Sequence, residues 1–175
     1  MQKTKAMRTI PNRQLTTNFS LYEFIEASPD NNQEFIAMNW ANINEFNEAN
    51  AMQLATFLQR LRTIINQRYK SDTGASAIGI RITSAFRCRD WDISRGRSAI
   101  GAHPLTLGVD IQPTNVSLAL GARILAELHK EYKPLKTGHQ GGLGLKKPTR
   151  NDSRVVTAMG FLHFDLLRRR RWDYP

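Results

Sequence analysis

The chain has 175 residues, of which 41% are hydrophobic and 23% charged, a balance that suits one globular domain with a sizeable core and argues against disorder. Its formal net charge of +10 at pH 7 is compatible with a polyanionic partner, and its one cysteine, Cys88, excludes an internal disulfide. No apolar run is long enough to predict a membrane span.

The first part of the sequence predicts two helices. Residues 1–17 are basic without a following apolar stretch, so we expect a loosely ordered N-terminal segment and no secretory signal. We expect a helix over residues 20–27, with Ser20 and Glu23 forming a capping box, and then an Asn-rich loop. Apolar residues at helical spacing predict an amphipathic helix over residues 51–69. Its buried side consists of Leu54, Leu58, Leu61 and Ile65.

Strands and one further helix are expected in the remainder. Three isoleucines alternate from residue 78 to 82 and predict a strand, which leads to an irregular arginine-rich segment at 87–101. A strand over 107–112 precedes an amphipathic helix over 117–131, for which Ser117 is the expected N-cap. The buried side of this helix is expected to hold Leu118, Ala122, Leu125 and Leu128.

Two histidines and the cysteine are most simply explained as residues without a catalytic role. His129 lies near the C-terminal end of a predicted helix, where the helix dipole favours a solvated cation. His139 lies in a glycine-rich loop and is expected to be exposed. Cys88 is expected to be a small structural residue, although its two arginine neighbours leave a thiol enzyme open as a chemical alternative.

The stretch GAHPLTLGVDIQP at residues 101–113 places His103 and Asp110 beside an apolar strand pattern. Leucine, valine and isoleucine alternate on one side of the predicted strand, so Asp110 points to the other side. Such polar residues are most often hydrogen-bonded structural groups. Imidazole nitrogen and carboxylate oxygen are also zinc ligands, so the pair could be half of a metal site.

A second alternating stretch, FLHFDLL at residues 161–167, offers a third ligand. Leu162, Phe164 and Leu166 share one side. Phe161, His163 and Asp165 share the other. If both apolar sides join one core, His163 and Asp165 face the same cleft as Asp110. Three protein ligands with a fourth position left open are typical of catalytic zinc sites.

These motifs resemble the zinc D-alanyl-D-alanine carboxypeptidase and peptidoglycan endopeptidase family, including its small phage-encoded members. The family pattern Ser-x-His-x-x-Gly-x-Ala-x-Asp matches residues 101–110, with His103 and Asp110 at the ligand positions. Its Ser, Gly and Ala positions are Gly101, Thr106 and Gly108 here. Further matching segments follow the family's order: NFSLYEFI at 18–25, IRITSAFRCRD at 80–90, GGLGL at 141–145 and GFLHFDLLRRRRW at 160–172.

The resemblance implies metal-assisted hydrolysis of an amide bond in peptidoglycan peptides. One zinc ion per chain would be held by His103, Asp110 and His163. Arg87 would bind the terminal carboxylate of the substrate, because a guanidinium group can pair both carboxylate oxygens at once, and Ser84 would hydrogen-bond the peptide beside it.

The general base is less evident. Several relatives carry an acid three residues before the last histidine ligand, where this chain has Gly160. Asp165 is the alternative, either as the base or as a group that orients a ligand. The next acidic candidates are Asp90, Asp92 and Asp152.

A basic protein that binds nucleic acid without catalysis is the main alternative. The run of arginines at 168–171, with Trp172 and Tyr174, mixes cations with rings that can stack on bases. Anionic wall polymers would attract the same charge. A third interpretation is a structural viral protein that keeps a degenerate peptidase fold.

We therefore expect one peptidase-like α+β domain over residues 1–175, with a small, mainly antiparallel sheet that carries the zinc site and is flanked by helices. Without a secretory signal, the protein would be made in the cytoplasm and act at the cell wall after release, or it would be carried in a virion.

Overall fold

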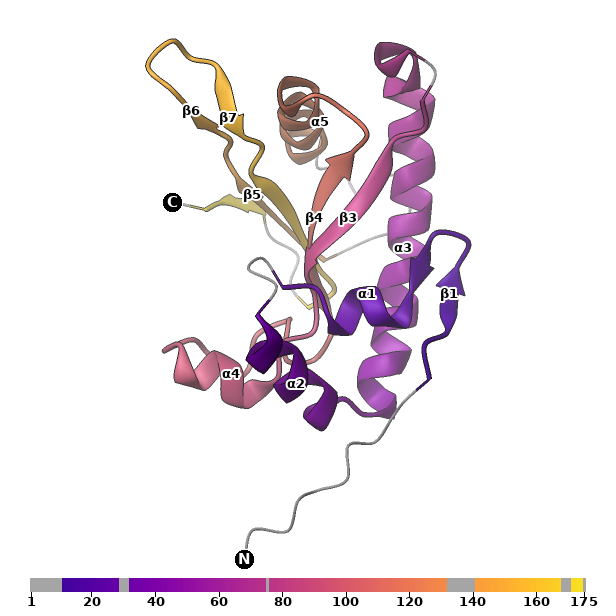
Figure 1. Cartoon of the computed structure of the whole chain (residues 1–175), viewed down its shortest axis with the longest axis vertical. Helices are drawn as coiled ribbons and strands as arrows, with labels where there is room; N and C mark the ends of the chain where they lie inside the picture. The colour runs from indigo at the N-terminus through magenta and orange to yellow at the C-terminus, as the bar shows by residue number, and fades with distance from the viewer. Residues whose placement is uncertain (1–10, 29–31, 75, 132–140, 168–170, 175) are drawn as a thin grey trace, which may run out of the picture.

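The computed structural model describes residues 11–28, 32–74, 76–131, 141–167 and 171–174, and within them a central five-stranded sheet carries the fold (Figure 1). Its strands, in spatial order, are β3 (Gly79–Ser84), β4 (Gly108–Thr114), β8 (Phe161–Asp165), β5 (Gly142–Lys146) and β9 (Arg171–Asp173). Neighbouring strands are antiparallel except β5 and β9, which are parallel. The expected α+β class with a mainly antiparallel sheet is confirmed.

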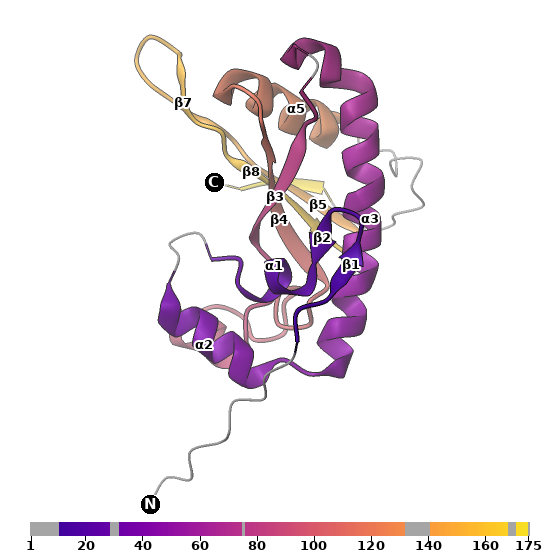
Figure 2. The same cartoon turned by 45° about the vertical axis from the view of Figure 1, so that its right-hand side comes forward.

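Helices and two small hairpins surround this sheet. The helices are α1 (Leu21–Ile25), α2 (Gln33–Asn42), α3 (Glu45–Tyr69), α4 (Arg89–Ser94) and α5 (Leu118–Lys130), and a 3-10 turn spans Lys70–Thr73. The hairpins are β1 (Gln14–Thr16) with β2 (Phe19–Ser20), and β6 (Thr149–Arg150) with β7 (Val156–Ala158). The β6–β7 hairpin projects from the end of the molecule opposite to α2 and α4 (Figures 1 and 2).

The long helix α3 covers the apolar face of the sheet. The four residues of α3 that were predicted to face inward are fully buried: Leu54, Leu58, Leu61 and Ile65. Phe57 of the same helix meets Phe164 of β8 edge to face, with 4.9 Å between the ring centroids. Val109 and Ile111 of β4 are also buried in this core, which confirms the predicted alternation of both strands. Each fully buried aliphatic side chain contributes roughly 1.5–3 kcal/mol to folding.

Asparagine side chains cap two helices in a segment where the sequence predicted a loop. Helix α2 occupies the segment expected to be an Asn-rich loop, and α3 begins at Glu45 rather than near residue 51. Asn32 and Asn44 explain the difference, because each side chain accepts a hydrogen bond from a backbone N–H in the first turn of α2 or α3. Buried Asn39 further ties α2 to α1 and to the end of β3 through two backbone carbonyls.

Three other local expectations are wrong. The segment at 87–101 is not wholly irregular, because it contains α4. Leu118 is 46% exposed rather than buried, since it lies at the first position of α5, before the buried residues of this helix. The loosely ordered segment does not reach residue 17, because β1 begins at Gln14 and Leu15 is buried in the core. By contrast, the expected hydrogen bonds of Ser20 with Glu23 and at Ser117 are present.

Candidate metal centre

One row of paired residues crosses all five strands of the sheet and carries the candidate site. Ser84 pairs with Asp110, Asp110 with His163, His163 with Gly144, and Gly144 with Trp172. A register shift near the end of β3 brings Ser84 into this row. A Cβ atom added at Gly144 would lie 2.4 Å from the Trp172 ring, so this position accommodates only glycine beside the indole.

His103 reaches the row from the loop before β4. Its Nδ1 donates a hydrogen bond to the carbonyl of Ala85 (2.6 Å), which leaves Nε2 directed at Asp110. Asn47 and Asn50 of α3 donate to the two backbone carbonyls that follow His103 (3.3 and 2.7 Å), and so brace the loop. The turn is completed by Thr106 in the left-handed region (φ 53°), a conformation that favours glycine.

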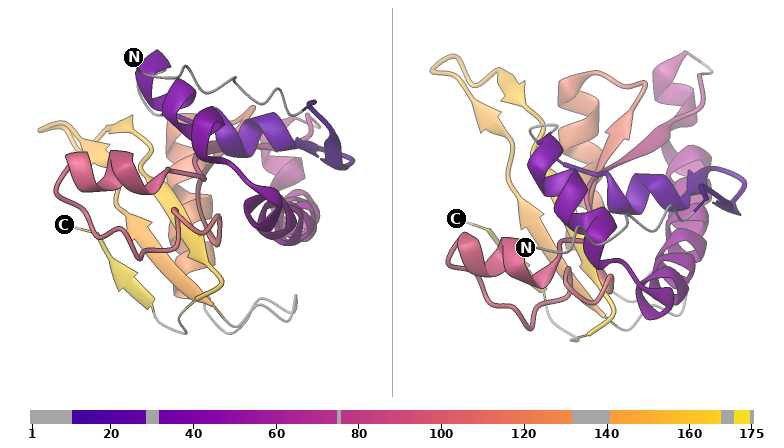
Figure 3. Two further views of the ribbon diagram at one scale, coloured as in Figure 1. Left: turned by 90° about the horizontal axis from the view of Figure 1, so that it is seen from below. Right: turned by 60° about the horizontal axis from the view of Figure 1, so that its bottom comes forward.

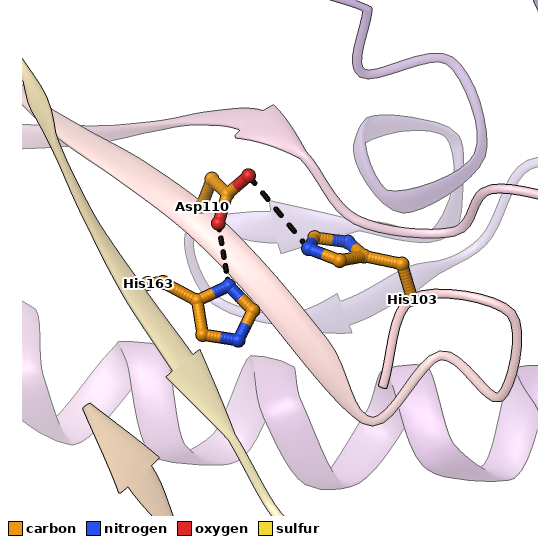
Figure 4. Close-up of side chains that lie close together, drawn as sticks. All are labelled: His103, Asp110 and His163. Atoms are coloured by element: carbon orange, nitrogen blue, oxygen red, sulfur yellow. Dashed lines mark hydrogen bonds and ion pairs between the residues drawn. The ribbon is translucent and has the colours of Figure 1, made fainter. Parts of the chain in front are cut away.

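His103, Asp110 and His163 converge on one point (Figure 4). One ligand atom from each lies within 4.8 Å of the others. His163 Nδ1 is 2.6 Å from Asp110 Oδ1, and His103 Nε2 is 3.7 Å from Asp110 Oδ2. All three side chains are buried. The three residues that the sequence singled out thus form a group that could hold a metal ion.

The two histidines of this group differ in protonation. Burial lowers the pKa of His103 to about 3, so its imidazole is neutral with a lone pair on Nε2. Burial also opposes a charge on His163, but hydrogen bonds to Asp110 and Asp165 outweigh it and raise the pKa of this ring above its usual value. Burial disfavours the charged form of Asp110 as well, yet attraction to the two histidines holds its pKa below the usual range.

Asp165 lies beside the ring nitrogen of His163 that faces away from the group. Its Oδ2 is 3.6 Å from His163 Nε2, and its Oδ1 accepts hydrogen bonds from the backbone N–H groups of Leu167 (2.9 Å) and Gly142 (3.3 Å). The second nitrogen of His103 is likewise held by a carbonyl. Metal-binding histidines are typically fixed in this way, so the donor set and its supporting oxygens suit zinc.

Two cavities meet at His103, one on each side of the group. The larger has a volume of about 610 Å³ and is also lined by Arg87, Ser84 and Asp110. Arg87 is held there by Asp92 (Nε to Oδ1, 3.0 Å) and by Ser84, whose hydroxyl accepts from its Nη1 at 3.3 Å. Ser84 therefore orients Arg87, a role that the sequence did not suggest. The smaller cavity, of about 340 Å³, is lined by His163 and Asp165.

The C-terminal strand closes the site with aromatic rings, to which the alternative hypothesis of a nucleic-acid binder assigned base stacking. Trp172 lies 5.4 Å from His163 between ring centroids, and Tyr174 lies 6.3 Å from it. Arg171 donates to two carbonyls at the C-terminal end of α5, which anchors β9. Residues 168–170 of the arginine run lie outside the described residues. The sequence offered two signals for this wall, the match of residues 160–172 to the family and the alternation of Trp172 and Tyr174.

The fold leaves no room for a side chain at residue 160, where several members of the peptidase family that the motifs resemble carry an acid. Gly160 has φ 77°, and a Cβ atom there would lie 2.1 Å from the carbonyl oxygen of Lys146. No side chain fits without a backbone shift. Of the other acidic candidates, Asp92 is buried against Arg87, whereas Asp90 and Asp152 are exposed and are not among the described residues that line either cavity.

Two further residues that the sequence raised, His129 and Cys88, do not belong to the group. His129 is buried rather than solvated, because its Nε2 donates to the carbonyl of Trp172 at 2.9 Å as β9 packs on α5. His139 falls outside the described residues. Burial raises the pKa of the Cys88 thiol, which disfavours the thiolate that a thiol enzyme requires.

Comparisons with protein-family models, curated proteins and solved structures find no match to this chain. None of the helices in the described part of the chain has the length and apolar character needed to cross a membrane.

Proposed function

We propose that this protein is a zinc-dependent peptidase that hydrolyses peptide bonds in the stem peptides or cross-links of peptidoglycan. The observation that carries the proposal is the convergence of His103, Asp110 and His163, with ligand atoms within 4.8 Å, at the junction of two cavities. A buried group of two imidazoles and a carboxylate beside open space is typical of a catalytic rather than a closed structural zinc site.

Zinc held by these three residues would polarise the scissile carbonyl and make water a nucleophile near neutral pH. The chain's own residues supply the rest. Arg87, fixed by Asp92 and Ser84, offers its remaining N–H groups to a substrate carboxylate. Asp165 holds the ring of His163 in place, and its position behind that ring favours an orienting role over that of general base.

The cell wall as the place of action, by release or from a virion, belongs to the same proposal. It rests on the likeness of the motifs to the peptidoglycan peptidases.

A non-catalytic binder of nucleic acid is the second candidate. It is favoured by the exposed basic residues of the projecting β6–β7 hairpin, Arg150 and Arg154. This function would leave the buried histidine and aspartate group without a role, because a basic binding surface requires no such residues.

The deciding experiment is incubation of zinc-loaded protein with purified muropeptides, with and without a chelator, followed by mass spectrometry. We expect metal-dependent cleavage that is lost in Asp110→Ala and unaffected in Arg150→Gln. Intact muropeptides under every metal condition, together with salt-sensitive binding to DNA, would favour the second candidate.

A further inference from the structure

The larger cavity beside the metal group has an excess of positive charge. Among the described residues that line it, Arg87, Arg95 and Arg97 are basic, and the acidic ones are Asp92 and, in the metal group, Asp110. Asp92 pairs with Arg87 at 3.0 Å and lies 3.7 Å from Arg97. Three guanidinium groups thus outnumber the two carboxylates of the described lining, and Asp110 is paired with His163, so positive charge remains for a ligand.

The arginines of this cavity are held by neighbouring groups. Arg95 stacks on the indole of Trp91, with its guanidinium carbon 4.6 Å from the ring centroid. Trp91 in turn meets Phe35 of α2 edge to face at 5.1 Å. The buried carboxylate of Asp92 lies within 4 Å of both Arg87 and Arg97. Arg87 is thus fixed by a short ion pair and Arg95 is oriented by stacking, whereas the Arg97 side chain is 54% exposed and lies at the open side of the cavity.

The cavity is also too large for a single terminal residue. Its volume of about 610 Å³ lies within the range, roughly 300–1,000 Å³, that accommodates a drug-sized ligand. The larger and the smaller cavity adjoin each other, since they share four lining residues: Ser98, Gly101, His103 and Tyr174. The metal group therefore lies along a cleft that extends to either side, and Figure 3 shows α4 with its following loop at this end of the sheet.

We propose that the cavity formed with α4 is an anion-binding chamber in which Arg95 and Arg97, together with Arg87, hold a peptide segment that carries at least two carboxylates. The peptide continues past His103 into the smaller cavity, so an internal bond, not the last one, lies at the metal group. This inference rests on the proposed peptidase function for the cleavage, but the binding of a dianionic peptide is independent of it.

The binding test uses metal-free protein and synthetic peptides blocked at both ends. Their sequence is two alanines followed by glutamate, alanine and glutamate, in L- and D-glutamate forms, with glutamine versions for comparison. We expect a glutamate form to bind about tenfold or more tightly than its glutamine form, because each charge-assisted hydrogen bond is strong in a partly enclosed site. Calorimetry measures both affinities.

Paired variants locate the effect. Arg95→Gln with Arg97→Gln should remove most of the preference for glutamate. Arg60→Gln with Lys70→Gln is the matched control, since it removes the same charge from exposed positions on α3 and the turn that follows it. The control should retain the preference. Equal affinity for both peptides, or an equal loss in the control, would overturn the proposal by showing no specific chamber.

Cleavage by the zinc-loaded protein separates this inference from the proposed function. Cleavage of the end-blocked glutamate peptide, slower in the Arg95 and Arg97 variant, supports both. Cleavage without any preference for glutamate leaves the peptidase and refutes the chamber. Selective binding to the metal-free protein without cleavage of any peptide or muropeptide supports the chamber and refutes the peptidase.

Discussion

Asp165 and His163 share one strand, and the carboxylate of the first contacts the ring of the second at the nitrogen that Asp110 does not use. The two acids thus hold the imidazole from two sides, Asp110 at Nδ1 and Asp165 at Nε2. This arrangement assigns them different tasks although they face the same histidine. Asp110 is available to a metal ion, whereas Asp165 is tied to backbone N–H groups.

The orienting role of Asp165 predicts the behaviour of Asp165→Asn. We expect zinc affinity to fall by about 10- to 100-fold, with muropeptide cleavage recovered in excess zinc, because the ring of His163 loses the charge that orients it. Zinc titration and cleavage rates measure both quantities. A general base would give the opposite pattern, with unchanged zinc affinity and turnover lowered by roughly 100-fold or more at any zinc concentration.

The ligand set predicts about one zinc ion per chain. Replacing His103, Asp110 or His163 by Ala should abolish tight binding, and chelation should lower the thermal midpoint of the intact protein, because a ligand that binds only the folded state stabilises it. His129→Gln serves as the control and should retain zinc, since that side chain contacts β9 outside the group. Metal analysis of zinc-loaded preparations provides the measurement, and a metal-free result for the unmodified protein would contradict the site.

Zinc binding should release a proton from His163. The raised pKa of this ring keeps Nδ1 protonated to a higher pH than in an ordinary histidine, and a ligand nitrogen must lose that proton. Affinity should therefore fall as the pH decreases below the raised pKa, by about tenfold per pH unit for one proton. His103 adds nothing above pH 5, because its pKa is about 3. Calorimetry in buffers of different ionisation enthalpy counts the protons, and Asp165→Asn should shift the release to lower pH.

Gly108 predicts a steric coupling within the site. A Cβ atom at this position would lie 2.7 Å from the Cβ of Ala102 and 3.1 Å from Cε1 of His163. Gly108→Ala should therefore destabilise the fold by about 1–3 kcal/mol, as overpacking typically does, and weaken zinc binding. The double variant with Ala102→Gly should recover part of the loss in urea unfolding. If Gly108→Ala were as stable as the unmodified protein, the loop that carries Ala102 would move aside without cost, and the prediction would be wrong.

The sequence predicted those features that depend on local periodicity. Alternation in β4 and β8 placed Asp110 and His163 on the face opposite the core, and the structure agrees. Helix α2 was missed because asparagine composition suggests a loop, whereas Asn32 caps a helix once α1 and β3 are beside it. Pairing across strands is a tertiary property, so neither the place of Trp172 beside His163 nor that of Asp165 at Nε2 could be read from spacing alone.

The register shift in β3 also determines where this strand can vary in length. In a regular strand Ser84 would share the apolar face with Ile80 and Ile82, but the extra residue, Thr83, turns it toward Asp110. Deletion of Thr83 would keep both of the neighbouring pairs, Ser84 with Asp110 and Ile82 with Ile111. Losing Arg81 instead would turn Ile80 away from the core. Among descendants of this sequence, single-residue deletions in β3 should therefore persist at Thr83 and be eliminated elsewhere in the strand.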